Sequence, residues 1–144
     1  MDQVVNILNE QLSNWHVLFV KLHNYHWNVK GSDFFTLHEK FEMLYNEAAG
    51  HIDELAERIL ALGAKPAGSF KAYLALSTVA EATGNESSRE MVEQIIVDFK
   101  TVVASAKSGI EAASEIGDET TVDLFTQIHV ALEKHIWLFT AFLG

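Results

Sequence analysis

The spacing of apolar side chains along the first half of the chain predicts two long helices joined by a short turn. Apolar residues recur every three or four positions from about residue 3 to 29 and again from about residue 34 to 62, the period of a helix with one buried face. Gly31 separates the two stretches, and Gly63 and Pro66 follow the second. We therefore expect two long helices that end at these residues.

Polar residues between the two stretches are candidate caps for the second helix. Ser32 and Asp33 precede its first apolar residues, and side-chain oxygens of these types accept hydrogen bonds from free N–H groups at a helix start. Thr36 and Glu39 also have the spacing of a capping box. The second helix is accordingly predicted to begin near residue 34.

The second half of the chain predicts two more long helices after a long connection. A short helix is predicted over residues 70–76 within that connection. Ser87 and Glu90 have the spacing of another capping box and open the third long helix, while Gly117 ends it and Asp118 caps the fourth. Four long helices with one long link fit an all-α four-helix bundle with a crossover, the topology of ferritin-like folds.

The size and composition of the chain predict one domain that associates with copies of itself. The 144 residues suit a single domain over residues 1–144 with one core. Hydrophobic residues make up 49% of the chain, and its mean hydropathy of +0.09 is high for a small monomer. One surface is therefore expected to be buried against other copies. A stripe of aromatic residues is expected in the core: Trp15, Phe19, Trp137, Phe139 and Phe142.

Charge and the lack of cysteine narrow the classes of function. The formal net charge is −10 and no run of Lys or Arg forms a basic patch, which argues against binding nucleic acid through its phosphates. An acidic surface suits the movement of cations better. The absence of cysteine excludes disulfides and thiolate metal sites. The chain shows neither a signal-peptide pattern nor an apolar stretch of the roughly 20 residues that span a membrane, so the cytoplasm is the expected compartment.

Residue types that bind metals gather on the first two predicted helices. His26 lies on the first, and His38, Glu42, Asp53 and Glu57 lie on the second. His38 and Glu42 are four residues apart, as are Asp53 and Glu57, so each pair points to one side of its helix. At about 100° per residue the four positions form one polar stripe, distinct from the apolar face of the same helix.

The length of the second helix limits how this stripe could bind a metal ion. His38 and Asp53 are 15 residues apart, or about 22 Å along a helix, whereas ligands lie within about 2.5 Å of a shared ion. Two copies of the helix that cross antiparallel about a two-fold axis near residues 47–48 would bring both pairs together twice, and Ala49 would permit a close approach. Spacing alone leaves two interpretations open, a metal site shared by two copies and a polar interface.

The types of ligand favour iron, and the remaining histidines do not extend the site. Two histidines with two or three carboxylates suit a ferrous or similar divalent transition ion. The Glu-x-x-His signature of a di-iron centre inside one bundle does not occur, so such a centre is not expected. The other histidines are interpreted as ordinary core or surface residues: His16, His23, His51, His129 and His135.

One run of the chain resembles a known family. The motifs HNYHW, TLHEKFE and HIDELAERI occur, in that order, within LHNYHWNVKGSDFFTLHEKFEMLYNEAAGHIDELAERILALGAKP. This run closely resembles the central segment of the Dps family, the DNA-protection-during-starvation proteins. The likeness continues through LEKHIWLFTAFLG, so it covers nearly the whole chain.

The resemblance implies a hollow dodecamer with tetrahedral symmetry that oxidises ferrous iron with hydrogen peroxide as the preferred oxidant and stores ferric oxide inside. It implies two iron ions in each ferroxidase site at a two-fold interface. His26 of one subunit with Asp53 and Glu57 of the partner subunit would bind the tighter iron, and Glu57 would bridge the two ions. His38, with Glu42 nearby, would help to bind the weaker iron.

The resemblance also assigns roles outside the ligand set. Trp27 would lie beside the site, and Asp118 and Asp123 would line a three-fold pore for iron entry, although a helix cap is the simpler role for Asp118. DNA-binding members of the family carry a Lys-rich tail, which is not found here and argues against direct DNA binding. The alternatives are a nucleoid-compacting protein that coats DNA and a structural shell with an inactive centre.

Overall fold

The predicted order of helices is confirmed. The computed structural model describes residues 1–144, has no strands, and contains no helix long and apolar enough to cross a membrane. Its five helices are α1 (Asp2–Asn28), α2 (Phe34–Ala61), α3 (Phe70–Leu76), α4 (Ser88–Glu115) and α5 (Glu119–Leu143). The bounds of the long helices agree with the predicted ones within a residue or two, and the short helix matches its predicted range.

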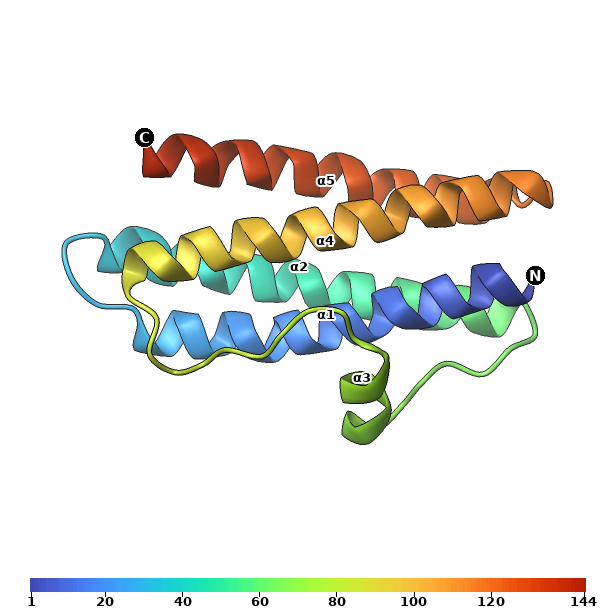
Figure 1. Ribbon diagram of the computed structural model, residues 1–144, viewed down its shortest axis with the longest axis horizontal. Coiled ribbons are helices and arrows are strands. Elements are labelled where there is room, and N and C mark those ends of the chain that lie inside the picture. The colour runs from blue at the N-terminus through green and yellow to red at the C-terminus, as the bar shows by residue number, and fades with distance from the viewer.

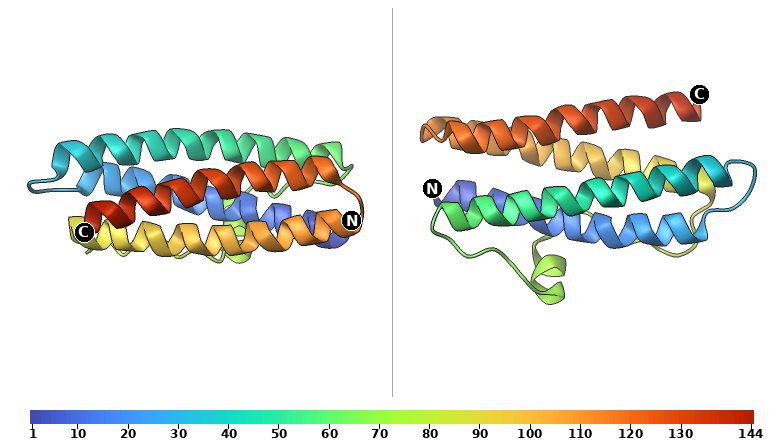
Figure 2. Two further views of the ribbon diagram at one scale, coloured as in Figure 1. Left: turned by 90° about the horizontal axis from the view of Figure 1, so that it is seen from above. Right: turned by 180° about the vertical axis from the view of Figure 1, so that it is seen from behind.

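The four long helices form an elongated bundle with one crossover (Figure 1). α1 packs against α2 and α4 packs against α5, while α1 also contacts α4 and α3. The chain turns back sharply between α1 and α2 and between α4 and α5. Between α2 and α4 it instead returns along the whole length of the bundle and carries α3 on the outside of α1 (Figures 1 and 2).

The predicted helix caps are confirmed in the second half of the chain but not at α2. The hydroxyl of Ser87 accepts from the Glu90 amide at 3.2 Å, and the Glu90 carboxylate accepts from the Ser87 amide at 3.1 Å. At α2 the capping box of Thr36 and Glu39 was wrong, because both residues lie inside the helix. The chain enters α2 through a turn in which the Phe34 amide already donates to the carbonyl of Gly31 at 3.1 Å, and the N-cap Asp33 makes no side-chain bond.

The core runs through the bundle, but it does not contain all the aromatic residues expected there. Trp15 and Phe139 are buried and Phe19 is half-buried against the core. Trp137 is 65% exposed and Phe142 is 39% exposed, so the prediction was wrong for these two. The reason is that α5 packs chiefly on α4, which leaves much of the surface of α5 without a neighbour in a single copy.

Polar side chains of α1 bind the crossover, a feature that the apolar pattern did not predict. The Asn9 side chain accepts from the Ala67 amide at 2.8 Å, and the Asn14 side chain accepts from the Thr78 amide at 2.7 Å. Lys21 is 2% exposed and donates to the carbonyl of Ala80 at 2.7 Å while it pairs with buried Asp98 of α4 at 2.8 Å. The crossover is therefore fixed along α1 by hydrogen bonds, since a buried amide or ammonium group left without a partner would be costly.

Gly109→Ala should destabilise the bundle, because a Cβ atom at Gly109 of α4 would lie 2.4 Å from the Phe125 ring of α5. We expect the free energy of unfolding to fall by about 1–3 kcal/mol, the usual cost of overpacking a core. Urea unfolding at a fixed protein concentration would measure it. Ser108→Ala, at the exposed neighbouring position, is the control and should not lower stability; equal stability of the two variants would contradict the close packing of α4 on α5.

Candidate metal centre

His26 and His38 form a reciprocal pair across the contact between α1 and α2. The Nδ1 atom of His26 lies 2.6 Å from the carbonyl oxygen of His38, and the Nδ1 atom of His38 lies 2.7 Å from the carbonyl oxygen of His26. The rings stack with centroids 3.8 Å apart at 12°. A carbonyl oxygen only accepts hydrogen bonds, so both Nδ1 atoms carry the proton of the neutral ring. Both Nε2 atoms therefore keep the free lone pair that binds a metal ion.

Neighbouring side chains surround this histidine pair on three sides. The Phe34 ring stacks on His38 at 4.8 Å, and the Tyr45 ring meets His26 edge-on at 5.4 Å. The Tyr45 hydroxyl donates to Glu42 at 3.3 Å, and this carboxylate lies 3.9 Å from the Nε2 atom of His26. His26 is only 7% exposed, whereas the Glu42 side chain is 53% exposed. The pair is thus held in place by packing and hydrogen bonds, with His26 buried and His38 half-buried.

Asp53 and Glu57 form an exposed acidic pair further along α2. A hydrogen bond with Asp53 and the negative charge of Asp53 together raise the pKa of Glu57 above its usual range. Two carboxyl groups this close repel each other when both are charged, so the pair favours one shared proton or a bound cation. The predicted side-by-side placement of these two residues is confirmed.

The histidine pair and the acidic pair remain separate within one copy of the chain. They lie at opposite ends of α2, because the 15 residues from His38 to Asp53 span about 22 Å of helix. No group of three or more His, Asp or Glu side chains in one copy is arranged to hold a metal ion. Each copy therefore carries two partial ligand sets that face solvent.

The structure shows the contacts of Trp27, which was expected beside the metal site, and of Asp118, which was expected to line a pore or cap a helix. Trp27 is 69% exposed and packs 5.4 Å from the His23 ring, beside the last turn of α1. Asp118 accepts from the Thr121 amide at 3.1 Å and pairs with Arg58 at 2.8 Å, so it acts as a helix cap and an ion-pair partner. These hydrogen bonds and the Arg58 charge outweigh burial and lower its pKa.

Asp123 is the exposed member of the two pore candidates. It accepts from Gln127 at 2.8 Å and borders a shallow hollow of about 410 Å³ between α2 and α5. Glu54 and Glu57 line the same hollow. Three acidic side chains, Glu54, Glu57 and Asp123, thus share this hollow with Arg58.

A polar cluster inside the bundle was not recognised as such in the sequence. Lys40 lies 3.3 Å from the Nδ1 atom of His135, and the Nε2 atom of His135 lies 2.9 Å from the Glu47 carboxylate. Lysine only donates, so Nδ1 accepts and the Nε2–H group donates to Glu47. Partial burial works to raise the pKa of Glu47, but hydrogen bonds and charge from His135 and His51 outweigh it and lower the pKa to about 2. The only available signal was the spacing of Glu47 and His51, four residues apart on one helix.

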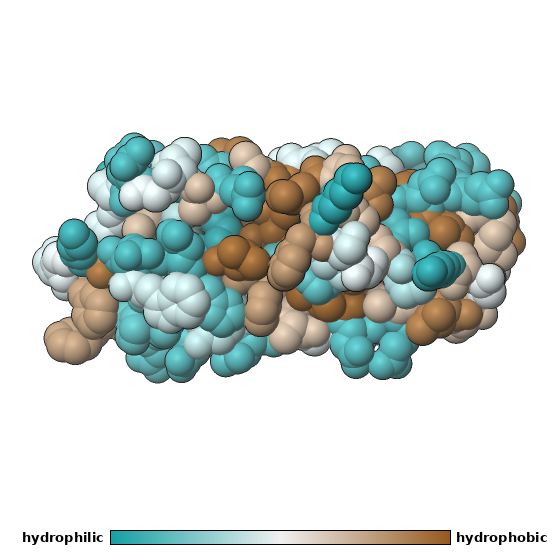
Figure 3. Space-filling model, turned by 90° about the horizontal axis from the view of Figure 1, so that it is seen from below, coloured by the Kyte–Doolittle hydropathy of each residue, from teal (hydrophilic) through white to brown (hydrophobic).

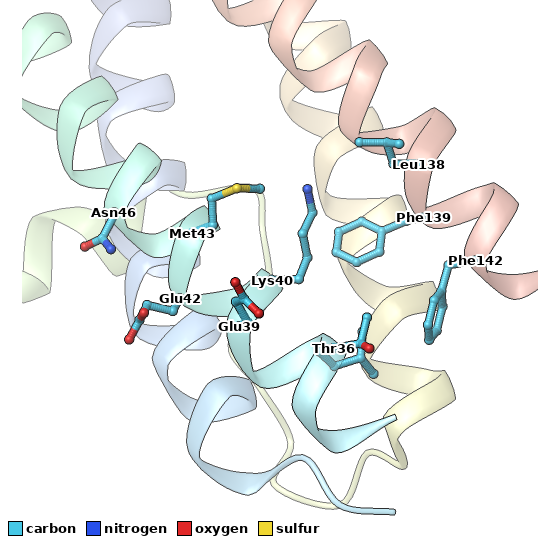
Figure 4. Close-up of a pocket in the computed structure, with 10 residues that line it drawn as sticks. Thr36, Glu39, Lys40, Glu42, Met43, Asn46, Leu138, Phe139 and Phe142 are labelled. Carbon is cyan, nitrogen blue, oxygen red and sulfur yellow. The ribbon is translucent and has the colours of Figure 1, made fainter. Parts of the chain in front are cut away.

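A wide groove of about 600 Å³ lies next to this cluster, between α2 and α5 (Figure 4). Lys40 lies between Met43 of α2 and Phe139 of α5, with its ammonium group 5.8 Å from the Phe139 ring. Of the candidate ligands only Glu42 borders the groove. Both apolar and polar side chains line the groove, and it is not the candidate metal centre because it lacks both histidines.

The comparisons with known proteins agree with this geometry. The family model of the ferritin-like domain matches residues 5–144. DNA protection during starvation protein 2 of Bacillus anthracis is 52% identical over 142 residues, which are 99% of this chain and 97% of that protein. The crystal structure of Dps from Staphylococcus aureus aligns with a TM-score of 0.98 at 44% identity and covers 100% of this chain and 97% of that one. The chain belongs to the Dps family.

A third comparison bears on the chemistry of Dps proteins. The Dps structure from Vibrio cholerae, with a TM-score of 0.96 and 36% identity, covers 99% of this chain and 90% of that one. That protein is described as a member of a broad superfamily of ferritin-like diiron-carboxylate proteins. The four-helix bundle with one crossover seen here is accordingly the ferritin-like fold in its Dps form.

Glu47→Gln should reduce stability at neutral pH and have less effect in acid. The folded protein lowers the pKa of Glu47 from 4.5 to about 2, so the charged carboxylate stabilises the fold above about pH 4.5, and this contribution is lost as the pH falls towards 2. Thermal unfolding at about pH 7 and about pH 3 would measure both values. Glu111→Gln, at an exposed position of α4, is the control; a Glu47→Gln penalty that is the same at both pH values would contradict the role of the charge.

Proposed function

We propose that this Dps-family protein oxidises ferrous iron at sites shared between two copies and stores the ferric product inside a dodecameric shell. The observation that carries the proposal is the pair of His26 and His38, whose Nδ1–H groups are bonded to each other's carbonyl oxygens and whose Nε2 lone pairs remain unused. A matching acidic pair lies on the same helix at a distance that one ion cannot span. Iron is the substrate of this reaction as well as the material that is stored.

The sharing of sites is supported by what α2 presents to solvent. The His38–Glu42 pair and the Asp53–Glu57 pair are centred equally far from the middle of α2, so an antiparallel crossing of two α2 helices would join unlike pairs at both ends. Ala49 is exposed near that crossing and would let the helices approach closely. The face seen in Figure 3, on the side of α1 and α3, also shows apolar side chains at its surface. Val20 of α1 and Phe70 and Leu74 of α3 are each more than half exposed. Burial of such side chains is what holds subunits together.

The assignment of ligands follows the resemblance to the Dps family, and it is compatible with the tautomers and charges. We assign the tighter iron to His26 of one copy with Asp53 and Glu57 of the partner subunit. His38, with Glu42 nearby, helps to bind the second iron, and Glu57 of the partner subunit bridges the two ions. Neutral imidazoles and carboxylates together suit ferrous iron, and the negative charge favours the ferric product. Binding of a cation between Asp53 and Glu57 would also relieve the repulsion that raises the pKa of Glu57.

Two iron ions at one site have a chemical advantage over one. Two ferrous ions give up one electron each, and one hydrogen peroxide molecule takes both electrons and two protons to become two water molecules. A single ferrous ion supplies only one electron, which splits hydrogen peroxide into hydroxide and hydroxyl radical. We propose hydrogen peroxide as the preferred oxidant, so that the reaction removes both ingredients of radical damage. This protects DNA without a direct contact, which agrees with the formal net charge of −10.

Iron entry is proposed to begin at the three-fold axes. Asp123 supports this better than Asp118, because Asp123 is exposed while Asp118 is occupied by Arg58 and Thr121. An acidic surface raises the local concentration of divalent cations. Glu54 and Glu57, which share a hollow with Asp123, extend this acidic surface towards the proposed site.

The double variant Asp53→Ala/Glu57→Ala should lose rapid iron oxidation. Ferrous iron would be added without oxygen and hydrogen peroxide then supplied, while ferric absorbance and the peroxide consumed are followed. We expect the wild-type protein to oxidise about two irons per peroxide and the variant to fall to the rate of free iron, since mutation of metal ligands removes the site. Glu111→Ala/Glu115→Ala, an exposed acidic pair of the same spacing on α4, is the control. Equal rates in all three proteins would leave only a polar interface and favour the DNA-coating alternative.

Mixing two inactive variants should restore part of the activity if the sites are shared. His26→Ala/His38→Ala and Asp53→Ala/Glu57→Ala would each lack every complete site. A dimer of one copy of each has one intact site, made from the histidines of one copy and the acids of the other. Random pairing after joint refolding should recover about a quarter of wild-type activity, because half the dimers are mixed and half their sites are intact. No recovery in shells shown to contain both variants would mean that the site lies within one copy.

A further inference from the structure

The last turn of α1 is tied to the crossover one residue before His26. We propose that Tyr25 and Glu86 are positioning residues for the metal-binding histidine His26, a role that rests on the proposed function. The Tyr25 hydroxyl donates to the Glu86 carboxylate at 2.6 Å, and the Tyr25 side chain is fully buried. Neither residue is a candidate ligand, and together they join the end of α1 to the segment that leads into α4.

Glu86 is held by the loop that carries it, which makes it a fixed anchor. Its two carboxylate oxygens accept from the amide and hydroxyl of Thr83 at 3.0 Å and 2.9 Å and from the amide of Gly84 at 2.9 Å. Burial works to raise the pKa of Glu86, but the hydrogen bonds from Tyr25 and Thr83 outweigh it and lower the pKa to about 2. The carboxylate is therefore charged at neutral pH and cannot turn away without leaving several donors unpaired.

The hydrogen bond to Glu86 acts on His26 through the packing of α1 on α2. The Tyr25 ring packs on Phe41 of α2 with centroids 5.7 Å apart, and the stacked pair of His26 and His38 forms the next contact between the same two helices. The Tyr25 carbonyl also accepts from the amide of Val29 at 3.0 Å, which closes the end of α1. A shift or fraying of this last turn would move the His26 ring and its carbonyl together, and both are needed for the reciprocal bonds to His38.

The other bonds between α1 and the crossover provide an internal comparison. Asn14 binds Thr78 and Ser77 in the middle of the crossover, 12 residues before His26, or about 18 Å along the helix. Its loss should weaken the fold without altering the last turn of α1. A positioning role for Tyr25 therefore predicts an effect on metal binding that Asn14 does not share.

The test is a titration of the assembled protein with Co²⁺, whose visible spectrum reports both affinity and coordination geometry. Tyr25→Phe removes only the hydroxyl and keeps the ring in the core, so the variant should fold. We expect Co²⁺ binding to weaken about tenfold with an altered spectrum, the usual effect of losing a group that orients a ligand. Glu86→Gln should have the same effect. The side-chain NH₂ group of the glutamine cannot accept a hydrogen bond, so it would face donors from which the carboxylate oxygen now accepts. Asn14→Ala should lower the unfolding temperature but bind Co²⁺ like the wild-type protein.

The Asp53→Ala/Glu57→Ala variant separates failure of this inference from failure of the proposed function. Wild-type binding of Co²⁺ that is lost in the acid variant supports the shared site. If Tyr25→Phe and Glu86→Gln then bind Co²⁺ with wild-type affinity and spectrum, the positioning role is overturned while the proposed function stands. If the acid variant binds Co²⁺ as the wild-type protein does, the shared site itself is overturned and the positioning role falls with it.

Discussion

The candidate centre depends on the reciprocal hydrogen bonds between His26 and His38. Each imidazole donates its Nδ1 proton to the backbone carbonyl of the other residue, so the two rings, the two backbones and both tautomers are fixed together. A single free histidine would have to be ordered by the metal ion at a cost in conformational entropy. This arrangement requires the tight turn after α1, which brings the last turn of that helix beside the first turns of α2. Without that turn, two histidines 12 residues apart would not meet.

Helix length is the second constraint, and it explains why the proposed centre needs a partner copy. An α-helix is rigid and rises about 1.5 Å per residue, so ligands at opposite ends of α2 never converge within one chain. The proposed two-fold crossing would turn this separation into an advantage, because it would yield two equivalent sites from one pair of contacts. It would also place the sites at the interface between the two copies. Metal binding and association would then stabilise each other, since each completes what the other needs.

The sequence predicted the helices and the ligand stripe because both depend on local spacing. Four-residue spacing places Asp53 beside Glu57 on any helix, and the Ser87–Glu90 capping box needs only one turn. The reciprocal bonds of His26 and the cluster of Glu47 with His135 depend instead on which helices lie side by side, and no local pattern contains that information. The exposure of Trp137 was missed for a related reason: the helical period places Trp137 near the apolar face of its helix, but which part of that face a neighbouring helix covers is not contained in the local pattern.

The polar groups inside the bundle explain why the candidate ligands lie on its outside. Half-buried Glu47 and buried His135 lie between α2 and α5, on the side where a centre within one bundle would need its ligands, but they are bonded to each other and His135 also accepts from Lys40. A divalent cation there would have to displace an ammonium group and break a charged hydrogen bond. The pairs at the two ends of α2 have the opposite character: the Nδ1–H groups of the histidines are used while their Nε2 lone pairs are not, and Asp53 raises the pKa of Glu57. In the proposed function, a metal ion would satisfy groups that the fold leaves unsatisfied, at a surface that a second copy would complete.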